Sequence, residues 1–482
     1  MRAKFLLLLG SLIACRSHTQ TISTDAGLVS GTTDTTGAIR IFRGIPFAAP
    51  PVGPLRWKEP QPVKAWTGVR RCVAFGPNPI QENWDPCSED CLYLNVWTGK
   101  GSKKPVIVWI YGGGFTGGSG AGGWCDGEGM ARKGVVFVTF NYRVGVLGFL
   151  AHPALSAESP NHSSGNYGIL DQIAALQWVK RNIAAFGGDP ANVTIAGESA
   201  GSCSVNTLIA SPLARGLFRR AIAESGGFFK PGRNMTLREA EAEGAATMRG
   251  KNALTLEAMR ALSTDSLLKG DYRRLPVVDG YLLPDHIDAL FRKGAINKVD
   301  LITGYNEGDF FIEHQMNTAQ FVSFAQMNYG EKAGAFLSLY PPDSARSQLA
   351  FFRDLLFGWE HYTWAKEEGA RAYMYYFDRV PPGEPKMGAF HSAEVCYALH
   401  TLPHQNRPWT AWDTTLSNLM SSYWVNFAFT GDPNGKGLPP WPLFSPRKTQ
   451  VIRFGDTVET MDLPAMRAFG FFDPYPTYLR RI

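Results

Sequence analysis

The chain has 482 residues, with 48 Lys and Arg against 42 Asp and Glu and a formal net charge of +6. This small excess is not gathered into a basic stripe, so we expect no nucleic-acid partner. Hydrophobic residues make up 44% of the chain, beside 51 Gly and 32 Pro. That composition excludes a disordered chain and is typical of a folded globular protein with many loops.

The N-terminus has the pattern of a signal peptide. Arg2 and Lys4 precede an apolar run over 5–13 that is too short to span a bilayer. We therefore predict an exported protein, secreted or periplasmic, with a signal over 1–15 and one domain over 20–482. Leu-Ile-Ala-Cys, ending at Cys15, also resembles a bacterial lipobox, so a lipid anchor at Cys15 stays open beside a plain cleaved signal.

Short runs rich in β-branched and aromatic residues predict a sheet. In chain order they cover 106–111 (VIVWIY), 135–142 (VVFVTFNY), 193–197 (VTIAG), 221–225 (AIAES), 299–304 (VDLITG) and 373–377 (YMYYF). Between the second and third runs, apolar residues recur at helical spacing over 166–186, and Gly-Gly-Asp-Pro at 187–190 ends that helix. Alternating strands and helices predict an α/β fold with a central, mostly parallel sheet flanked by helices.

The strongest chemical signal is Gly-Glu-Ser-Ala-Gly at 197–201. It follows the strand 193–197 directly and precedes a helical run over 204–211, which is the context of a nucleophile elbow in the α/β-hydrolase fold. Such a turn strains the central serine, so Gly197 and Gly201 must be small for strand and helix to approach. Ser199 is therefore the predicted nucleophile.

A serine nucleophile needs donors for the oxyanion of its tetrahedral adduct. The glycines of Tyr-Gly-Gly-Gly-Phe at 111–115 follow a strand, so the backbone N–H groups of Gly113 and Gly114 are predicted donors, with that of Ala200. A dinucleotide loop at 118–123 (GSGAGG) is the rival interpretation, but it opens no clear helix. We expect no cofactor. The Cys and His spacings do not match a metal site, and we expect no metal.

The base must follow the nucleophile in the chain, with the acid between them. His391 stands in a loop just after the strand 373–377 and is the predicted base, with His400 and His404 as alternatives.

For the acid, Glu307 closes the segment Leu-Ile-Thr-Gly-Tyr-Asn-Glu-Gly after a strand, where a carboxylate can hold the imidazole in the right tautomer. Glu307 is the predicted acid, and Asp309 is its nearest competitor.

Blocks over nearly the whole mature chain resemble the type B carboxylesterase and cholinesterase family. They are FRGIPFAAPPVGPLRW (42–57), SEDCLYLNVW (88–97), VWIYGGGF (108–115), NYRVGVLGFLAHP (141–153), the stretch 166–201, and YWVNFAFTGDPNG (423–435). The resemblance implies a serine carboxylesterase of the α/β-hydrolase fold, which cleaves small-molecule esters through an acyl-enzyme intermediate.

Carried over residue by residue, the resemblance implies the same nucleophile, oxyanion donors and base as the motifs do. It makes Glu307 the acid, although the family's usual block has two more residues before its Glu-Gly, which keeps Asp309 open. It also implies a disulfide between Cys72 and Cys91.

The resemblance leaves two further questions. Trp84 is similar in place to the choline-binding Trp of cholinesterases, but its loop is shorter, and we expect a packing role. A non-catalytic binding module on the same fold is one alternative function, disfavoured by the intact Ser199 set. A lipase is another, and it would need an apolar lid that the sequence does not reveal.

Overall fold

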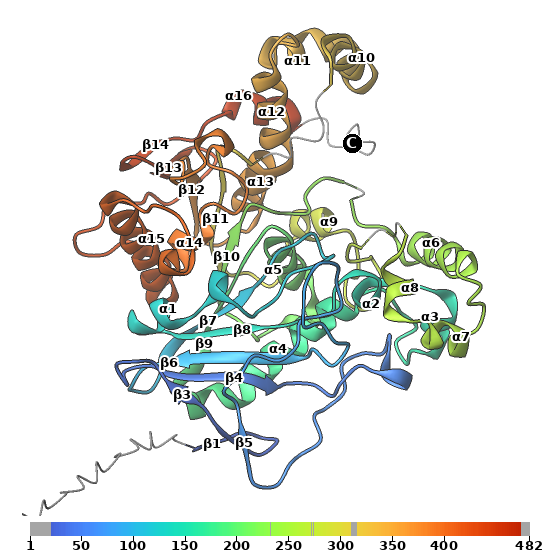
Figure 1. Ribbon diagram of the computed structural model, residues 1–482. Helices are drawn as coiled ribbons and strands as arrows, with labels where there is room; N and C mark the ends of the chain where they lie inside the picture. The colour runs from blue at the N-terminus through green and yellow to red at the C-terminus, as the bar shows by residue number, and fades with distance from the viewer. Residues whose placement is uncertain (1–20, 232, 271, 273, 310–315, 474–482) are drawn as a thin grey trace, which may run out of the picture.

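The computed structural model describes residues 21–231, 233–270, 272, 274–309 and 316–473 (Figure 1). The predicted signal peptide and Cys15 lie outside these residues.

The described strands form one large sheet and one small sheet. The large sheet has 11 strands in the order β14-β13-β12-β11-β10-β9-β7-β8-β6-β4-β3. Their bounds are β3 (Thr32–Thr33), β4 (Arg40–Pro46), β6 (Tyr93–Thr98), β7 (Lys104–Ile110), β8 (Val136–Phe140), β9 (Gly188–Glu198), β10 (Arg220–Glu224), β11 (Asp300–Asn306), β12 (Ala372–Phe377), β13 (Gln450–Phe454) and β14 (Val458–Asp462). The small sheet joins β1 (Thr21–Ser23), β2 (Leu28–Ser30) and β5 (Val69–Arg71). Each predicted strand is confirmed.

The large sheet is parallel from β8 through β13 and antiparallel at both edges, as predicted. In such a sheet the carboxyl ends of the parallel strands meet at one edge, which is where open α/β sheets bind their ligands. The loops after β7, β9, β11 and β12 carry the predicted site residues, so the topology gathers them at this edge.

Helices cover both faces of the sheet (Figure 1). They are α1 (Glu128–Arg132), α2 (Gly145–Phe149), α3 (Pro153–Glu158), α4 (Tyr167–Asn182), α5 (Ala200–Ala210), α6 (Leu237–Gly250), α7 (Leu256–Ala261), α8 (Thr264–Leu268), α9 (Ile287–Arg292), α10 (Thr318–Tyr329), α11 (Ala333–Leu339), α12 (Ala345–Arg353), α13 (Trp359–Glu367), α14 (Val395–Ala398), α15 (Ala411–Thr430) and α16 (Met466–Phe472). The helix predicted over 166–186 is confirmed as α4 and the 3₁₀ turn Ile183–Phe186 that extends it.

The sheet separates two hydrophobic cores, because alternate side chains along each strand point to opposite faces. Along β7, Val106, Val108 and Ile110 join the core that includes α4 and α5, whereas Ile107 and Trp109 join the core that includes α15. Successive side chains of a strand point to opposite faces, so one continuous apolar run serves both layers.

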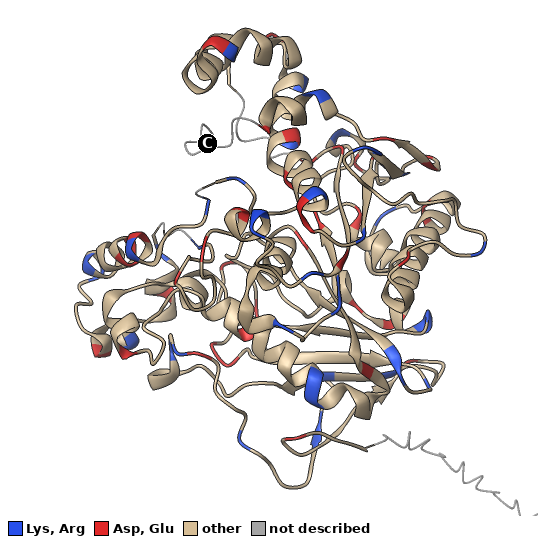
Figure 2. Ribbon diagram, turned by 180° about the vertical axis from the view of Figure 1, so that it is seen from behind, with Lys and Arg blue, Asp and Glu red and all other residues tan. Residues whose placement is uncertain are grey.

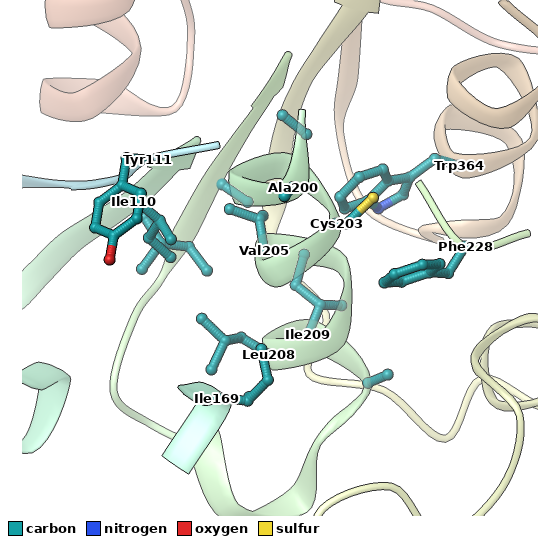
Figure 3. Close-up of a cluster of buried hydrophobic side chains, with 14 of the residues drawn as sticks. Ile110, Tyr111, Ile169, Ala200, Cys203, Val205, Leu208, Ile209, Phe228 and Trp364 are labelled. Atoms are coloured by element: carbon teal, nitrogen blue, oxygen red, sulfur yellow. The ribbon is translucent and has the colours of Figure 1, made fainter. Parts of the chain in front are cut away.

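Helix α5 directly follows the predicted nucleophile and is buried along its whole length. Figure 3 shows Val205, Leu208 and Ile209 of this helix packed among side chains such as Ile110 and Phe228. A helix that is buried on all sides is held by the residues packed around it. The rigid core therefore fixes the N-terminus of α5, where Ser199 lies.

The charged side chains are spread over the surface. On the side shown in Figure 2, Lys and Arg are interspersed with Asp and Glu. No helix in the described part of the chain is long and apolar enough to cross a membrane.

Candidate active site

Ser199 lies on a strained turn between β9 and α5. Its φ of 56° and ψ of −121° fall in a region that residues with a side chain rarely adopt. Its N–H donates to the carbonyl of Glu224 at 2.8 Å, and its own carbonyl accepts from the N–H of Cys203 at 2.9 Å. Bonds on both sides hold the strained backbone, and the side chain is partly exposed at the sheet edge. The structure thus places Ser199 on a tight turn between a strand and a helix, which is the backbone context of a nucleophile elbow.

The glycines around Ser199 are required by close backbone approach. A Cβ on Gly201 would lie 2.0 Å from the carbonyl oxygen of Ile110, and one on Gly197 would lie 2.6 Å from the carbonyl carbon of Gly201. A third glycine that the motif does not include has the same role, since a Cβ on Gly226 would lie 2.3 Å from the carbonyl oxygen of Ser199. Strand β7, strand β9 and helix α5 meet here with no room for a side chain.

The glycine loop after β7 passes against the nucleophile. A Cβ on Gly112 would lie 3.0 Å from Cβ of Ser199. Gly113 and Gly114 have φ values of 103° and 61°, which suit glycine alone. In the described part of the chain, the N–H groups of Gly113, Gly114 and Ala200 donate to no protein acceptor. Backbone N–H groups that are not used within the protein are able to donate to a substrate oxygen.

His391 is paired with Asp309. Nδ1 of the imidazole lies 2.8 Å from Oδ1 of Asp309, whose side chain is fully buried. The other carboxylate oxygen of Asp309 accepts from the hydroxyl of Ser225 and from the N–H of Asn306, each at 2.7 Å. The carboxylate is thus fixed by two donors while it orients the ring, which is the role of a triad acid.

The structure does not bring Glu307, the predicted acid, to His391. Its side chain is 50% exposed and pairs with Arg353 at 3.6 Å. A turn is the reason: the N–H of Asp309 donates to the carbonyl of Asn306 at 3.3 Å, so the chain reverses just after β11. Residue 309, and not residue 307, therefore faces the histidine. Asp309 is the residue that the sequence leaves open as the competitor of Glu307. The sequence does not identify Ser225, whose hydroxyl donates to Asp309, although Ser225 ends a predicted strand.

The alternative histidines lie elsewhere. Nδ1 of His400 lies 2.9 Å from the hydroxyl of Ser417, and His404 reaches Asp126 only at 3.9 Å. The loop at 118–123, considered for a dinucleotide, leads only into the three-residue 3₁₀ turn Gly123–Cys125. Among the described residues, no group of three or more His, Cys, Asp and Glu side chains is arranged to hold a metal ion.

A cavity of about 870 Å³ opens beside the nucleophile. Gly112, Gly113, Glu198 and Ser392 are among the residues that line it. Two indoles line it as well, Trp84 and Trp124, which are 46% and 52% exposed. The expected packing role of Trp84 is therefore wrong, because its ring faces the cavity and is not enclosed in the core.

The chain matches the family model described as "Carboxylesterase family" over residues 18–340 and 340–469. The chain belongs to the carboxylesterase family. It is similar to a fumonisin B1 esterase of Sphingopyxis macrogoltabida, with 38% identity over 480 residues that cover 90% of this chain and 86% of that protein. It is also similar to a para-nitrobenzyl esterase of Bacillus subtilis, with 35% identity, covering 91% of this chain and 96% of that one.

Solved carboxylesterase structures agree with the fold. A PNB esterase structure has a TM-score of 0.83 at 32% identity and covers 93% of this chain and 99% of its own. A carboxylesterase of Geobacillus stearothermophilus has a TM-score of 0.82 at 33% identity, with coverages of 93% and 98%. The chain is a carboxylic ester hydrolase, as its sequence predicted.

The histidine of this carboxylesterase is held between two acids. Burial alone would lower the pKa of His391, but the charge of Glu198 and the hydrogen bond and charge of Asp309 outweigh it and raise the pKa to about 9. Nε2 lies 3.3 Å from Oε1 of Glu198. Both carboxylates therefore favour the protonated imidazolium.

Further buried carboxylates surround the site. Burial raises the pKa of Glu224 to about 8 against the hydrogen bond from the indole of Trp424, and burial also raises the pKa of Glu394 well above its usual range. Glu394 accepts from the side-chain amide of Asn306. The sequence interpretation missed both acids, and no motif marks them, because only the fold turns them inward.

The structure does not show the disulfide that the resemblance implies between Cys72 and Cys91, and all six described cysteines are free in it. The two thiols sit in different surroundings: Cys72 follows the small sheet, with Sγ 4.0 Å from the carbonyl of Gly44, while Cys91 leads into β6 near the buried pair of Arg143 and Asp171. Burial raises the pKa of the Cys72 thiol to about 11.

Proposed function

We propose that this enzyme hydrolyses carboxylic esters with Ser199 as nucleophile, His391 as base and Asp309 as the acid that orients it. The contact of Asp309 with Nδ1 of His391, in a loop beside a strained Ser199, is the observation that carries this proposal. The N–H groups of Gly113, Gly114 and Ala200 form the oxyanion hole.

The steps follow from these positions. His391 takes the hydroxyl proton as Ser199 attacks the ester carbonyl, and the oxyanion hole stabilises the tetrahedral adduct. The imidazolium then gives its proton to the alcohol, which leaves an acyl group on Ser199. Water, activated by the same histidine, releases the carboxylate and restores the serine.

The cavity beside Glu198 is the pocket for the alcohol. His391 protonates the leaving oxygen, so the alcohol departs on the side of the imidazole. Glu198, beside Nε2, and Ser392, next in the chain, both line the cavity. The cavity therefore continues from the point where the alcohol is released.

The walls of the alcohol pocket favour a bulky apolar group. A volume of about 870 Å³ is at the large end of the range for small-molecule sites. The half-exposed indoles of Trp84 and Trp124 present broad apolar faces. Charged residues line the cavity as well, namely Glu82, Glu198, Lys269 and Arg274. Esters of large apolar alcohols are the proposed substrates.

Replacing Trp124 by alanine tests this pocket. For acetate esters of alcohols from ethanol to 2-naphthylmethanol, kcat/KM of the wild type is expected to rise with alcohol size. The W124A variant is expected to lose roughly tenfold or more on the largest alcohol and little on ethyl acetate, because the small alcohol does not reach the indole.

Phe429 gives a matched control, since its ring is 46% exposed on α15 and does not line the cavity, so F429A should leave the whole series unchanged. An equal loss on small and large alcohols in W124A would contradict the assigned pocket. Fumonisin B1, named as substrate of a relative, belongs in the same panel.

Export is proposed from Arg2, Lys4 and the apolar run over 5–13. Mass spectrometry of the mature N-terminus is expected to find the first residues removed. A diacylglyceryl mass on Cys15, lost in C15S together with membrane association, supports the lipid anchor; an unmodified N-terminus near residue 15 supports plain secretion. An intact Met1 on enzyme that stays in the cytoplasm would contradict export.

A further inference from the structure

Ser392 follows His391 and makes a contact that the reaction steps do not use. Its hydroxyl donates to Oε1 of Glu198 at 2.6 Å, and its side chain lines the alcohol pocket. A hydrogen bond this short to an ionised acceptor is among the stronger ones in proteins.

The same carboxylate oxygen faces the histidine. Oε1 of Glu198 lies 3.3 Å from Nε2 of His391, the nitrogen that must take the proton of Ser199. Glu198 therefore connects two consecutive residues of one loop, His391 and Ser392. A group that fixes the position of Glu198 Oε1 therefore also affects its pairing with the imidazolium of His391.

The surroundings oppose a charge on Glu198. Burial raises its pKa, the nearby charge of Asp309 raises it further, and only His391 and the hydroxyl of Ser392 lower it. The titratable groups that face Glu198 and His391 from the packed elements all ionise to anions: Asp309, Glu224, Glu394, Tyr375 and Cys203. A neutral hydroxyl donor is thus one of the two contacts that favour the ionised form.

We propose that Ser392 is a positioning residue that holds an ionised Glu198 against Nε2 of His391, so that the resting enzyme stores its base as an imidazolium between two carboxylates. This inference rests on the proposed roles of Ser199 and His391. Raising the pH removes the stored proton and frees Nε2 for the hydroxyl of Ser199.

The backbone of Ser392 supports a dedicated role. Its φ is 73°, a value that favours glycine, so a side chain at this position is strained. Strain of this kind persists only where the surrounding structure imposes it, and it concentrates at functional sites. Glycine would relax the backbone but would lose the hydroxyl that contacts Glu198.

Two contacts of Glu198, with Ser392 and with His391, determine the direction in which the pKa of His391 changes. Without the hydroxyl of Ser392, Glu198 binds a proton more readily and becomes neutral. A neutral Glu198 no longer stabilises the imidazolium, so the pKa of His391 falls from about 9 toward its usual value. More of the enzyme then has a free base at neutral pH, and activity there rises relative to activity at pH 9.

The test is the pH dependence of kcat/KM for an activated acetate ester. In S392A and S392G, the midpoint of the rise with pH is expected to move to lower pH by about half a unit or more, and in E198Q by about one to three units. In the double variant S392A/E198Q the midpoint should equal that of E198Q, because Ser392 acts through Glu198. The rate of Ser199 phosphonylation by an organophosphate should shift in the same way.

Two variants at position 392 separate chemistry from folding, since S392A keeps the strain and S392G removes it. S417A is a matched control, because it deletes a buried hydroxyl bonded to another histidine, His400, outside the pocket. A uniform loss of kcat/KM with no shift in midpoint, or a shift to higher pH, would overturn the proposal. Retained activity in S199A would instead overturn the proposed function itself.

Discussion

Replacing Ser199 by alanine is expected to reduce kcat for ester hydrolysis on the order of 10⁶-fold, the loss typical of removing the nucleophile of a serine hydrolase. The fold should persist, because the strained turn is held by backbone bonds to Glu224 and Cys203 that alanine keeps. Turnover of a p-nitrophenyl acetate series measures the loss, and thermal unfolding checks that the variant is folded.

Covalent labelling gives the second readout of the same variant. In the wild type, an organophosphate is expected to add the mass of one phosphoryl adduct to the peptide that contains Ser199. In S199A the same peptide should keep its unmodified mass. S338A, which removes an exposed hydroxyl on α11, should be labelled and active like the wild type. Full turnover by folded S199A would show that another group is the nucleophile.

Replacing Asp309 by asparagine is expected to reduce kcat by about 10⁴-fold, because the amide can no longer orient the histidine tautomer or stabilise the imidazolium. E307Q should change kcat less than about twofold, since the half-exposed Glu307 pairs with Arg353 on the surface and such pairs contribute little. Steady-state kinetics of the two variants make this comparison.

The two substitutions are matched in chemistry and lie two residues apart, so a general disturbance of the loop would affect both. D309N is also expected to lower the pKa of His391, because Asp309 contributes a hydrogen bond and a charge that raise it. The opposite ranking, with E307Q inactive and D309N active, would restore Glu307 as the acid.

The sequence did not reveal which of two neighbouring carboxylates contacts His391, because a contact between distant segments determines it. Glu307 and Asp309 both follow β11, and sequence spacing does not tell which carboxylate points toward the base. The reversal at Asn306 decides it, because that turn is paired with the His391 loop: the N–H of Gly308 donates to the carbonyl of Ala389 at 2.9 Å. A contact between segments so distant in the chain leaves no local pattern.

The surroundings of Trp84 and the state of the cysteines also depend on tertiary contacts that the sequence does not reveal. The sequence does not distinguish a tryptophan that lines a cavity from one that packs in the core. The loop that carries Trp84 has no hydrophobic periodicity that would indicate which way its side chain points. The pairing of Cys72 with Cys91 rests on the resemblance alone, and the structure does not show it.

By itself the sequence determined six of the parallel strands, helix α4, the strand-turn-helix context of Ser199, the glycine loop and the family. These depend on short-range patterns: apolar runs, helical spacing and glycines where a Cβ has no room. The tertiary structure alone decided which carboxylate meets His391, how Ser392 and Glu198 flank it, and where the cavity beside Glu198 opens. Those depend on side chains brought together across strands β9, β11 and β12, whose proximity the folded sheet creates.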